Sequence, residues 1–485
     1  MLSVSAMVYI MVLCAGWLAT LYISPFYGVL LYVIEYLVNP PARWWYSGLP
    51  HWRYSFIIMA LVLLSYLLRK SQFSENRFLA LPQGKWLTLM AAVVVITSLW
   101  AVDRELHAAF TVRYLKVLLF VILAFKVTDT ARKFEALMGA YLLGTGYLSF
   151  LIWQTGRTGS GRLEGIGCAD STDANGTAAL LSTVVPLLVF YALFTKNRWL
   201  QLACATGLAF TLNGLILLNS RGAYLALVAS MAYFCLLVFR EKGLRGQKAK
   251  IVAGVLAAAC LFLYLADEVF WTRMATIKEV GASAELETHN RVDYWMVTPE
   301  MLKQHPLGGG ARTYHVLSPH YLPAEWLTGG KRAVHSMWFE VMSEYGYHGF
   351  CIFLGYVLSV SRLARKVRKH LIEQGDSYHA FQSAALEASW ISMLIAATFI
   401  NFFYGELTYW LPMFIAAFAN IHLYRFANAP LQNLRPVQNG SVVQESFAVQ
   451  GGSAVKDGTA AKDGTADIQG SAGLCASSLV RKLSA

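Results

Sequence analysis

The feature that most constrains this chain is a series of long apolar segments that recur along most of its length. A helix needs about 20 apolar residues to cross the hydrocarbon core of a bilayer. After the first 38 residues, segments that reach or approach this length cover residues 54–68, 85–102, 107–126, 133–154, 177–194, 198–218, 221–239, 251–268, 345–361, 384–404 and 408–425. Because only helices and closed barrels satisfy every backbone hydrogen bond within lipid, this pattern predicts an all-α, polytopic membrane protein.

The composition excludes most soluble classes of protein. Hydrophobic residues make up 56% of the chain and charged residues 14%, whereas a soluble domain carries about 25% charged residues. This composition argues against a soluble enzyme, a disordered scaffold and a collagen-like fibre. The net charge of +12 comes from basic residues in short clusters between apolar segments. Such clusters are typical of membrane orientation and not of nucleic-acid binding.

The distribution of lysine and arginine predicts which connections face the cytoplasm. Nineteen of these residues lie in one alternate set of short connections, which covers 69–85, 126–133, 195–198, 240–250 and 361–370. The positive-inside rule places this set in the cytoplasm. Alternation then predicts about twelve spans with both chain ends cytoplasmic. This count requires that residues 1–38 cross the membrane once in total. The region of Pro25 would then be either a kink in that span or a short helix in the interface. Residues 1–20 lack a basic stretch and a cleavage site, so we interpret them as a retained membrane segment.

Two longer segments contain no apolar run. Residues 269–344 form one large loop, which alternation places in the periplasm, and their content of Trp, Tyr, Leu and Val predicts that the loop folds over the mouth of the bundle. Residues 427–485 are rich in Gly, Ser, Ala and Gln and repeat the unit KDGTA, which predicts a disordered cytoplasmic tail. We therefore divide the chain into a transmembrane domain, residues 1–426, and this tail.

Three cations lie in apolar segments near the predicted periplasmic face. Arg221 opens a span in NSRGAYLAL, and Arg113 and Lys116 share a helix face because they are three residues apart. A cation in this position snorkels, pairs with a carboxylate, or faces water or a ligand. Glu35 is the candidate partner of Arg113 and Lys116; the alternative is an anionic ligand such as a lipid diphosphate. For Arg221 the alternatives are an interfacial arginine and a two-pronged clamp for an anion.

The large loop carries further candidates. Arg291 stands in THNRVDYW, and His335 lies shortly before the chain returns to the membrane. For His335 the alternatives are an interfacial residue that forms hydrogen bonds and a general base with a near-neutral pKa. His315 and His320 are five residues apart and lack a third ligand, so we expect no metal site there. No motif calls for a cofactor.

Two polar motifs are interpreted as structural. CADSTDANGT lacks the remaining ligand positions of a calcium-binding loop, so its acidic and amide residues predict a cap for the helix that follows. The GGG at 308–310 lacks the lysine and hydroxyl residue of a phosphate-binding loop and predicts a turn.

Four motifs, in their order and spacing, resemble the bacterial O-antigen ligase superfamily, which includes O-antigen ligases, O-antigen polymerases and O-glycosylation ligases. They are DANGTAALLSTVVPLL, NSRGAYLAL, RVDYW followed by HPLGGG, and VHSMWFEVMSEYGYHGF. An early segment, SPFYGVLLYVIEYLVNP, is similar to O-glycosylation ligases that are associated with exosortase systems. The resemblance covers roughly residues 20–425.

This resemblance implies an enzyme of the bacterial inner membrane that transfers a glycan from undecaprenyl diphosphate on the periplasmic face, with inversion and without a metal. It implies that Arg221 and Arg291 hold the donor diphosphate and that His335 is the base for an acceptor hydroxyl. The acceptor is lipid A core, another repeat unit or a protein side chain, and Ser336 stands where many members have Asn. The rival function is a transporter of lipid-linked sugars; the lack of a clear internal repeat and the single large loop favour the enzyme.

Overall fold

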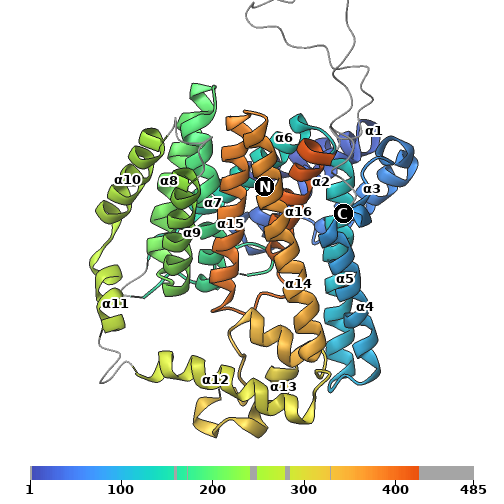
Figure 1. Cartoon of the computed structure of the whole chain (residues 1–485), viewed down its shortest axis with the longest axis vertical. Helices are drawn as coiled ribbons and strands as arrows, with labels where there is room; N and C mark the ends of the chain where they lie inside the picture. The colour runs from blue at the N-terminus through green and yellow to red at the C-terminus, as the bar shows by residue number, and fades with distance from the viewer. Residues whose placement is uncertain are drawn as a thin grey trace, which may run out of the picture. The chain divides into compact units, whose positions relative to one another are not determined.

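The computed structural model describes residues 3–157, 161–171, 173–240, 248–278, 285–327 and 329–424 (Figure 1). Within these ranges the regular structure is helical and no strand is present, which confirms the all-α fold class. The predicted tail, residues 427–485, lies outside the described residues. The α-helices are α1 (Val4–Tyr22), α2 (Pro25–Val38), α3 (Tyr54–Leu68), α4 (Pro82–Ile96), α5 (Arg104–Val127), α6 (Ala131–Thr155), α7 (Ala174–Phe194), α8 (Arg198–Leu218), α9 (Arg221–Arg240), α10 (Lys248–Leu265), α11 (Glu268–Lys278), α12 (Glu285–Gln304), α13 (Thr313–Tyr321), α14 (Met337–Glu373), α15 (Ser377–Ala397) and α16 (Leu407–Ala419).

Most helices follow the apolar segments of the sequence. The bounds of α3 and α8 are the predicted ones, and the other helices begin or end a few residues away. Side chains that accept otherwise unpaired backbone N–H groups mark several helix starts, such as Asp103 before α5 and Asn197 before α8. Two helices differ more from the prediction. α14 begins at Met337 instead of near 345, and α15 ends at Ala397 although its apolar segment continues to residue 404.

The segment 398–406 leaves helical geometry because the start of α14 holds it by hydrogen bonds. The buried Glu340 carboxylate accepts the backbone N–H of Phe403 at 3.0 Å. The indole N–H of Trp338 donates to the hydroxyl of Thr398 at 3.1 Å. The backbone N–H of Phe403 thus finds its acceptor on α14 instead of within a continuous helix, and the segment lies along α14 before α16 begins.

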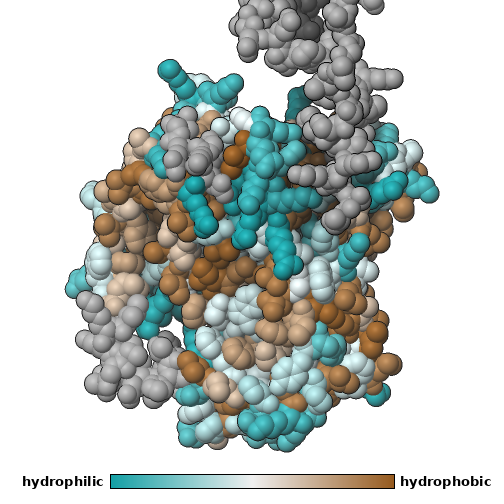
Figure 2. Space-filling model, viewed as in Figure 1, coloured by the Kyte–Doolittle hydropathy of each residue, from teal (hydrophilic) through white to brown (hydrophobic). Residues whose placement is uncertain are grey.

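By length and apolar composition, eight of the described helices qualify as membrane spans, or up to nine if α3 and the bent 3-10 segment after it form one span. The helices α2, α4 and α16 have 14, 15 and 13 residues and are shorter than a full crossing requires. Hydrophobic residues cover much of the visible face over α4, α5 and α8–α10, and hydrophilic residues gather toward the top and bottom of the view (Figure 2). The chain is therefore a multi-pass membrane protein, and the count of twelve spans stays a prediction.

The first two helices form an antiparallel hairpin. Pro25 occupies the first turn of α2, and the hydroxyl of Ser24 caps that helix. Gly16 lies against Leu31, and Gly28 lies against Thr20, so the two helices run in opposite directions at close distance. This arrangement differs from the single kinked crossing, or crossing with an interfacial helix, that the sequence predicted. The reason is that proline here starts a second helix instead of bending the first.

Hydrogen bonds gather one set of connections at one end of the bundle, which we call the basic end. The side-chain amide of Asn76 donates to the backbone carbonyl of Lys126 at 2.7 Å, which links the connection after α3 to the end of α5. The amide of Gln382 donates to the carboxylate of Glu135 at 2.6 Å, which links the starts of α15 and α6. The connections after α3 and before α6 belong to the lysine- and arginine-rich set that the positive-inside rule assigns to the cytoplasm. The predicted basic connection 361–370 instead lies within α14, which continues to Glu373 before α15 begins at Ser377.

The alternate connections meet at the opposite end, which we call the loop end. The amide of Asn39, after α2, donates to the backbone carbonyl of Cys168, before α7, at 3.2 Å. The backbone N–H of Val102, before α5, donates to the carbonyl of Gly309 in the large loop at 2.8 Å. The grouping of connections at two ends therefore follows the charge pattern of the sequence.

The large loop is folded and lies over the loop end, where α12 and α13 are found below α14 (Figure 1). It has a small hydrophobic core of its own, made of Tyr294, Met301, Tyr314, Leu322 and Val334. The predicted turn at 308–310 has positive φ at Gly308 and Gly310. Gly308 packs against the backbone of Gly346, where α14 is broken by a positive φ, and side chains at these two glycines would clash with backbone atoms.

Candidate functional site

The loop end contains the start of α7, which is fixed by an acidic cap. The carboxylate of Asp173 accepts the backbone N–H groups of Asn175 and Gly176, both at 3.0 Å. The hydroxyl of Ser171 donates to the other carboxylate oxygen of Asp173. This confirms the predicted role of the CADSTDANGT motif as a helix cap. The first turn of α7 is thereby held in place with Asn175 at its start.

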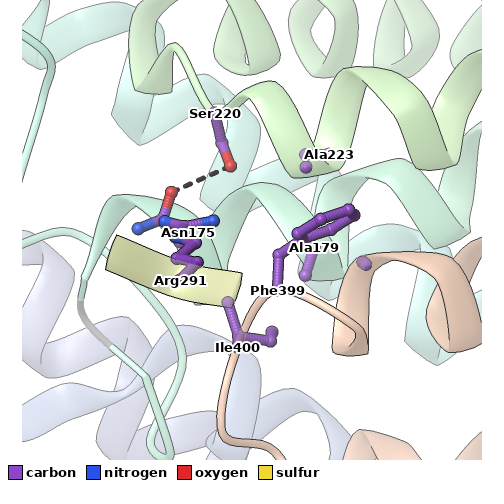
Figure 3. Close-up of a pocket in the computed structure, with 9 residues that line it drawn as sticks. Asn175, Ala179, Ser220, Ala223, Arg291, Phe399 and Ile400 are labelled. Carbon is purple, nitrogen blue, oxygen red and sulfur yellow. Dashed lines mark hydrogen bonds between the residues drawn. The ribbon is translucent and has the colours of Figure 1, made fainter. Parts of the chain in front are cut away.

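The start of α9 is joined to the start of α7. The hydroxyl of Ser220 donates to the side-chain oxygen of Asn175 at 2.9 Å (Figure 3). Arg221 is the first residue of α9 and stands between Ser220 and Gly222, which both line the same pocket. The N-terminal ends of two helices therefore lie close together. The carboxylates of Asp173 and Glu164 already accept the first N–H groups of α7, so the partial positive charge that favours a further anion is that of the α9 end.

Arg291 completes this pocket from the large loop. It comes from α12 and lines the pocket opposite Phe399 and Ile400, the residues that follow α15 (Figure 3). We call the cavity bordered by Asn175, Ser220, Arg291, Phe399 and Ile400 the Arg291 pocket. Its volume is ≈ 10 Å³, about the room that one water molecule needs. Thus Arg291 lines this cavity, whereas Arg221 does not line it, although the residues on either side of Arg221 do.

His335 is held close to Arg291 by the segment that precedes α14. The indole N–H of Trp295, one turn after Arg291 on α12, donates to the backbone carbonyl of Val334 at 3.1 Å. The ring of Trp295 also stacks on Phe339 with a centroid separation of 5.6 Å. His335 itself has a φ of 52°, a left-handed conformation that costs free energy for a residue with a side chain. These contacts hold the strained backbone of His335 beside α12.

The surroundings of His335 favour its neutral form. Burial is the main cause that lowers the pKa of the imidazole from 6.5 to about 4, and the positive charges of Arg291 and Arg332 lower it further. The carboxylate of Asp173 acts in the opposite direction. The imidazole is therefore neutral at neutral pH and has a lone pair available to accept a proton. Because Arg291 and Asp173 both affect this pKa, His335 lies near both Arg291 and the cap of α7.

Arg332 is a cation of the site that the sequence did not single out. Its guanidinium lies over the ring of Tyr294 at 4.9 Å from the centroid, and its backbone N–H donates to the hydroxyl of Ser318. Asn175 and Ser220 were also missed as pocket residues, although both stand in the motifs DANGT and NSRG.

Arg113 has a carboxylate partner other than the candidate that the sequence offered. It pairs with Asp170 at 2.6 Å, and the second oxygen of Asp170 accepts the hydroxyl of Tyr36 and the backbone N–H of Glu406. The sequence had proposed Glu35 as its partner. The sequence analysis interpreted Asp170 only as part of a capping motif. Its pairing with Arg113 was not predicted, because 57 residues separate the two along the chain.

Lys116 lines a different cavity from Arg291. Its side chain is exposed and faces a cavity between α2, α3 and α5 that Glu35 also borders. Neither Arg113 nor Lys116 lines the Arg291 pocket. The assignment of these two cations to the donor diphosphate therefore stays a prediction.

The fold and the site together define a multi-pass helical membrane protein with an arginine-lined pocket and a neutral histidine at one end of the bundle. Residues 206–354 match the family model described as O-Antigen ligase, and this match supports the predicted resemblance to the O-antigen ligase superfamily. The matched segment contains Arg221, Arg291 and His335, whereas Arg113 and Lys116 lie outside it. Comparison with curated proteins gave no match. The family supports, at a coarse level, an enzyme of the membrane glycosyltransferase type, either a ligase or a polymerase.

Proposed function

We propose that this protein transfers a glycan from undecaprenyl diphosphate to a hydroxyl of an acceptor, in the bacterial inner membrane and on the periplasmic face. The observation that carries the proposal is the meeting of three elements of the matched segment at the loop end: the start of α9 with Arg221, Arg291 on α12, and His335 before α14. The Lys and Arg asymmetry supports the periplasmic orientation of this end.

The cations and helix ends provide the leaving-group chemistry. When the bond between the sugar and the diphosphate breaks, negative charge develops on the diphosphate oxygen that leaves. Arg221 and Arg291 stabilise this charge, since each guanidinium offers two parallel donors to phosphate oxygens. The N-terminal end of α9 adds to the positive potential. With this charge stabilised by arginines, the proposed reaction needs neither a metal ion nor a general acid at the leaving group.

His335 provides the base. Its neutral imidazole accepts the proton of the acceptor hydroxyl as the hydroxyl oxygen attacks the anomeric carbon of the donor sugar. One bond forms and one breaks in a single displacement, so the anomeric configuration inverts. The donor itself assists, because its negative charge offsets the arginines that lower the pKa of His335.

The small size of the Arg291 pocket has a mechanistic consequence. A space of ≈ 10 Å³ does not hold a diphosphate, so donor binding requires the pocket to open. The side chains that close it opposite Arg291 are Phe399 and Ile400, which belong to the non-helical segment 398–406. We propose that this segment moves away from α12 when the donor enters, as loops do at many active sites.

The function is tested with purified protein, undecaprenyl-diphosphate glycan and the three candidate acceptors, which are lipid A core, a second repeat unit and an acceptor protein. Mass spectrometry detects a new glycosidic bond, and NMR of the product reports the anomeric configuration. We expect transfer to one acceptor with inversion, and loss of transfer in Arg291→Ala. Lys303→Ala is the matched control, because Lys303 is an exposed cation on the same helix. Movement of the donor across vesicles without a new bond would instead support the transporter.

A further inference from the structure

A line of exposed side chains runs along one face of α14 and changes from apolar to basic. Its members follow one another at intervals of three or four residues, which places them on one side of a helix. They are Cys351, Leu354, Leu358, Arg362, Arg365 and Lys369. We call the last three residues of this line the basic stripe. Hydrophilic residues extend from the top of the view down its middle in Figure 2, where Figure 1 places α14.

The cations of the basic stripe form no ion pair with a carboxylate in the part of the chain that the structure describes. Glu373 follows Lys369 by four residues, yet these two side chains do not pair. Lys366 is directed elsewhere, since its ammonium lies over the ring of Tyr424 at 5.4 Å from the centroid. Like charges three and four residues apart on a helix repel each other. The face therefore carries net positive charge that a ligand can neutralise.

Contacts of Arg368 show how deep the basic stripe lies in the bundle. Its guanidinium donates to the carboxylate of Glu387 on α15 at 3.1 Å, and the hydroxyl of Tyr233 on α9 donates to the same carboxylate at 2.5 Å. Tyr233 stands seven residues before the end of α9 at Arg240, about 10 Å along the helix axis. Both α9 and α15 qualify as membrane spans. The first two residues of the basic stripe precede Arg368 on α14, which starts at the loop end, so they lie deeper still.

The combination of depth and exposure calls for a ligand of mixed character. Charged side chains at membrane depth are costly unless they reach the headgroup layer or meet an opposite charge. Leu354 and Leu358 are 37% and 44% exposed on the same helix face. A molecule that covers this face must therefore be apolar along the leucines and anionic at the basic stripe. Phospholipids have this build.

We propose that the basic stripe binds the headgroup of an anionic glycerophospholipid, such as phosphatidylglycerol, whose acyl chains lie along Leu354 and Leu358. The guanidinium groups of Arg362 and Arg365 offer paired donors to the phosphate oxygens. Burial of the apolar surface of the leucines adds to the binding. A zwitterionic headgroup also contains a phosphate, but its ammonium group is repelled by the basic stripe. A headgroup with net negative charge therefore fits this face better.

This proposal does not depend on the proposed function. The basic stripe lies toward the basic end of α14, whereas His335 precedes the start of this helix at the loop end. None of the residues of the basic stripe lines the Arg291 pocket. Lipid binding and transfer are therefore removed by different variants.

Native mass spectrometry of the delipidated full chain measures this binding. The probes are phosphatidylglycerol and phosphatidylethanolamine with the same acyl chains, and we expect the wild type to bind the anionic lipid more tightly. Arg365→Gln should weaken the binding of phosphatidylglycerol roughly fivefold, the usual contribution of one basic residue near an anionic surface. The triple variant Arg362→Gln, Arg365→Gln and Lys369→Gln should abolish the preference for the anionic lipid.

A matched triple variant removes the same charge elsewhere at the basic end. Arg132→Gln, Lys196→Gln and Arg198→Gln replace three exposed cations at the starts of α6 and α8. This variant should bind phosphatidylglycerol as the wild type does. Arg291→Ala should do so too, because the Arg291 pocket lies at the other end of the bundle. Loss of phosphatidylglycerol binding in Arg291→Ala would place the lipid in the donor site and overturn the proposal.

Three other results would also overturn the proposal. One is equal binding of the two lipids by the wild type, and another is wild-type binding of phosphatidylglycerol by the triple variant of the basic stripe. The third is an equal loss of binding in the matched triple variant. Circular dichroism checks that each variant is folded, and Arg365→Gln alone carries the test if the triple variant is not. Transfer activity is not the readout, so failure here leaves the proposed function standing.

Discussion

The protonation of His335 gives the sharpest test of the proposed mechanism. Burial, with Arg291 and Arg332, lowers the pKa of this imidazole from 6.5 to about 4. The pH profile of kcat/KM reports the ionisation of the free enzyme. We therefore expect kcat/KM to stay level as the pH falls through 6.5 and to decline only near pH 4. An unperturbed histidine would instead lose half of its activity at about pH 6.5.

The same shift affects stability, with a definite sign. A folded-state pKa below the unfolded value means that the native state binds this proton less readily than the unfolded state. The stability associated with His335 is therefore fully present above pH 6.5 and is lost as the pH falls through about 4. The fall in rate at low pH must be distinguished from acid unfolding of the protein. Circular dichroism at each pH reports how much of the protein remains folded.

One substitution isolates the electrostatic part of the shift. Arg332→Gln removes a positive charge near His335, so the acid midpoint of kcat/KM should rise by roughly one unit, the usual effect of a close charge. The midpoint should stay below 6.5, since burial is the larger cause. Lys331→Gln is the matched control, because Lys331 is exposed and contributes nothing to the pKa of His335.

The assay is the rate of product formation by mass spectrometry across the pH range, with donor affinity measured separately. His335→Ala should lose about 100-fold or more in turnover, the usual size of a general-base contribution, while donor affinity survives. A wild-type midpoint near 6.5, or an unchanged midpoint in Arg332→Gln, would refute the electrostatic reasoning. Normal turnover in His335→Ala would dismiss the base itself.

Three further predictions follow from the site and the charge pattern. Arg221→Ala should abolish transfer and Arg221→Lys should remain severely impaired, because an ammonium does not reproduce a two-pronged contact with phosphate; wild-type transfer by the lysine variant, measured at equal protein abundance in the membrane, would contradict this. Asp173→Ala should lower the free energy of unfolding by about 1 kcal/mol through loss of the α7 cap, and a thermal melt that does not change would speak against the cap. In a background without native cysteines, a cysteine at position 320 should react with an impermeant thiol reagent on intact cells and one at position 245 should not; the reverse pattern would invert the orientation and move the site to the cytoplasm.

The sequence was sufficient where local periodicity or charge decides the structure. The bounds of α3 and α8 follow directly from apolar runs flanked by polar residues. The DANGT motif identified the cap of α7, because a helix start needs an acceptor for its first N–H groups and Asp173 supplies it at the expected spacing. Arg221, Arg291 and His335 were predicted as site residues from short motifs. The structure brings the segments that carry them to one end, and their roles stay predictions.

The sequence was insufficient where partners are distant along the chain. The pair formed by Arg113 and Asp170 requires knowledge of how the loop before α7 packs on α5. The same holds for the contact between Ser220 and Asn175, which joins two helix starts 45 residues apart. Hydropathy alone also misread the end of α15, because the N–H of Phe403 finds its acceptor on α14. These pairings depend on tertiary packing, which no local window contains.

The division of the site between two parts of the chain has a consequence for biogenesis. Asn175 and Ser220 are in place once α7, α8 and α9 have inserted, whereas Arg291 and His335 belong to the large loop with its own small core. The bond from Trp295 to Val334 joins α12 to the segment before α14, and the turn at 308–310 docks the loop on α14. The pocket is therefore incomplete until α14 has been synthesised and inserted. A nascent chain therefore holds no assembled Arg291 pocket during insertion into the bilayer. In the proposed reaction, the ability to transfer a glycan consequently arises only after insertion is complete, and a truncated or stalled product cannot use the proposed donor.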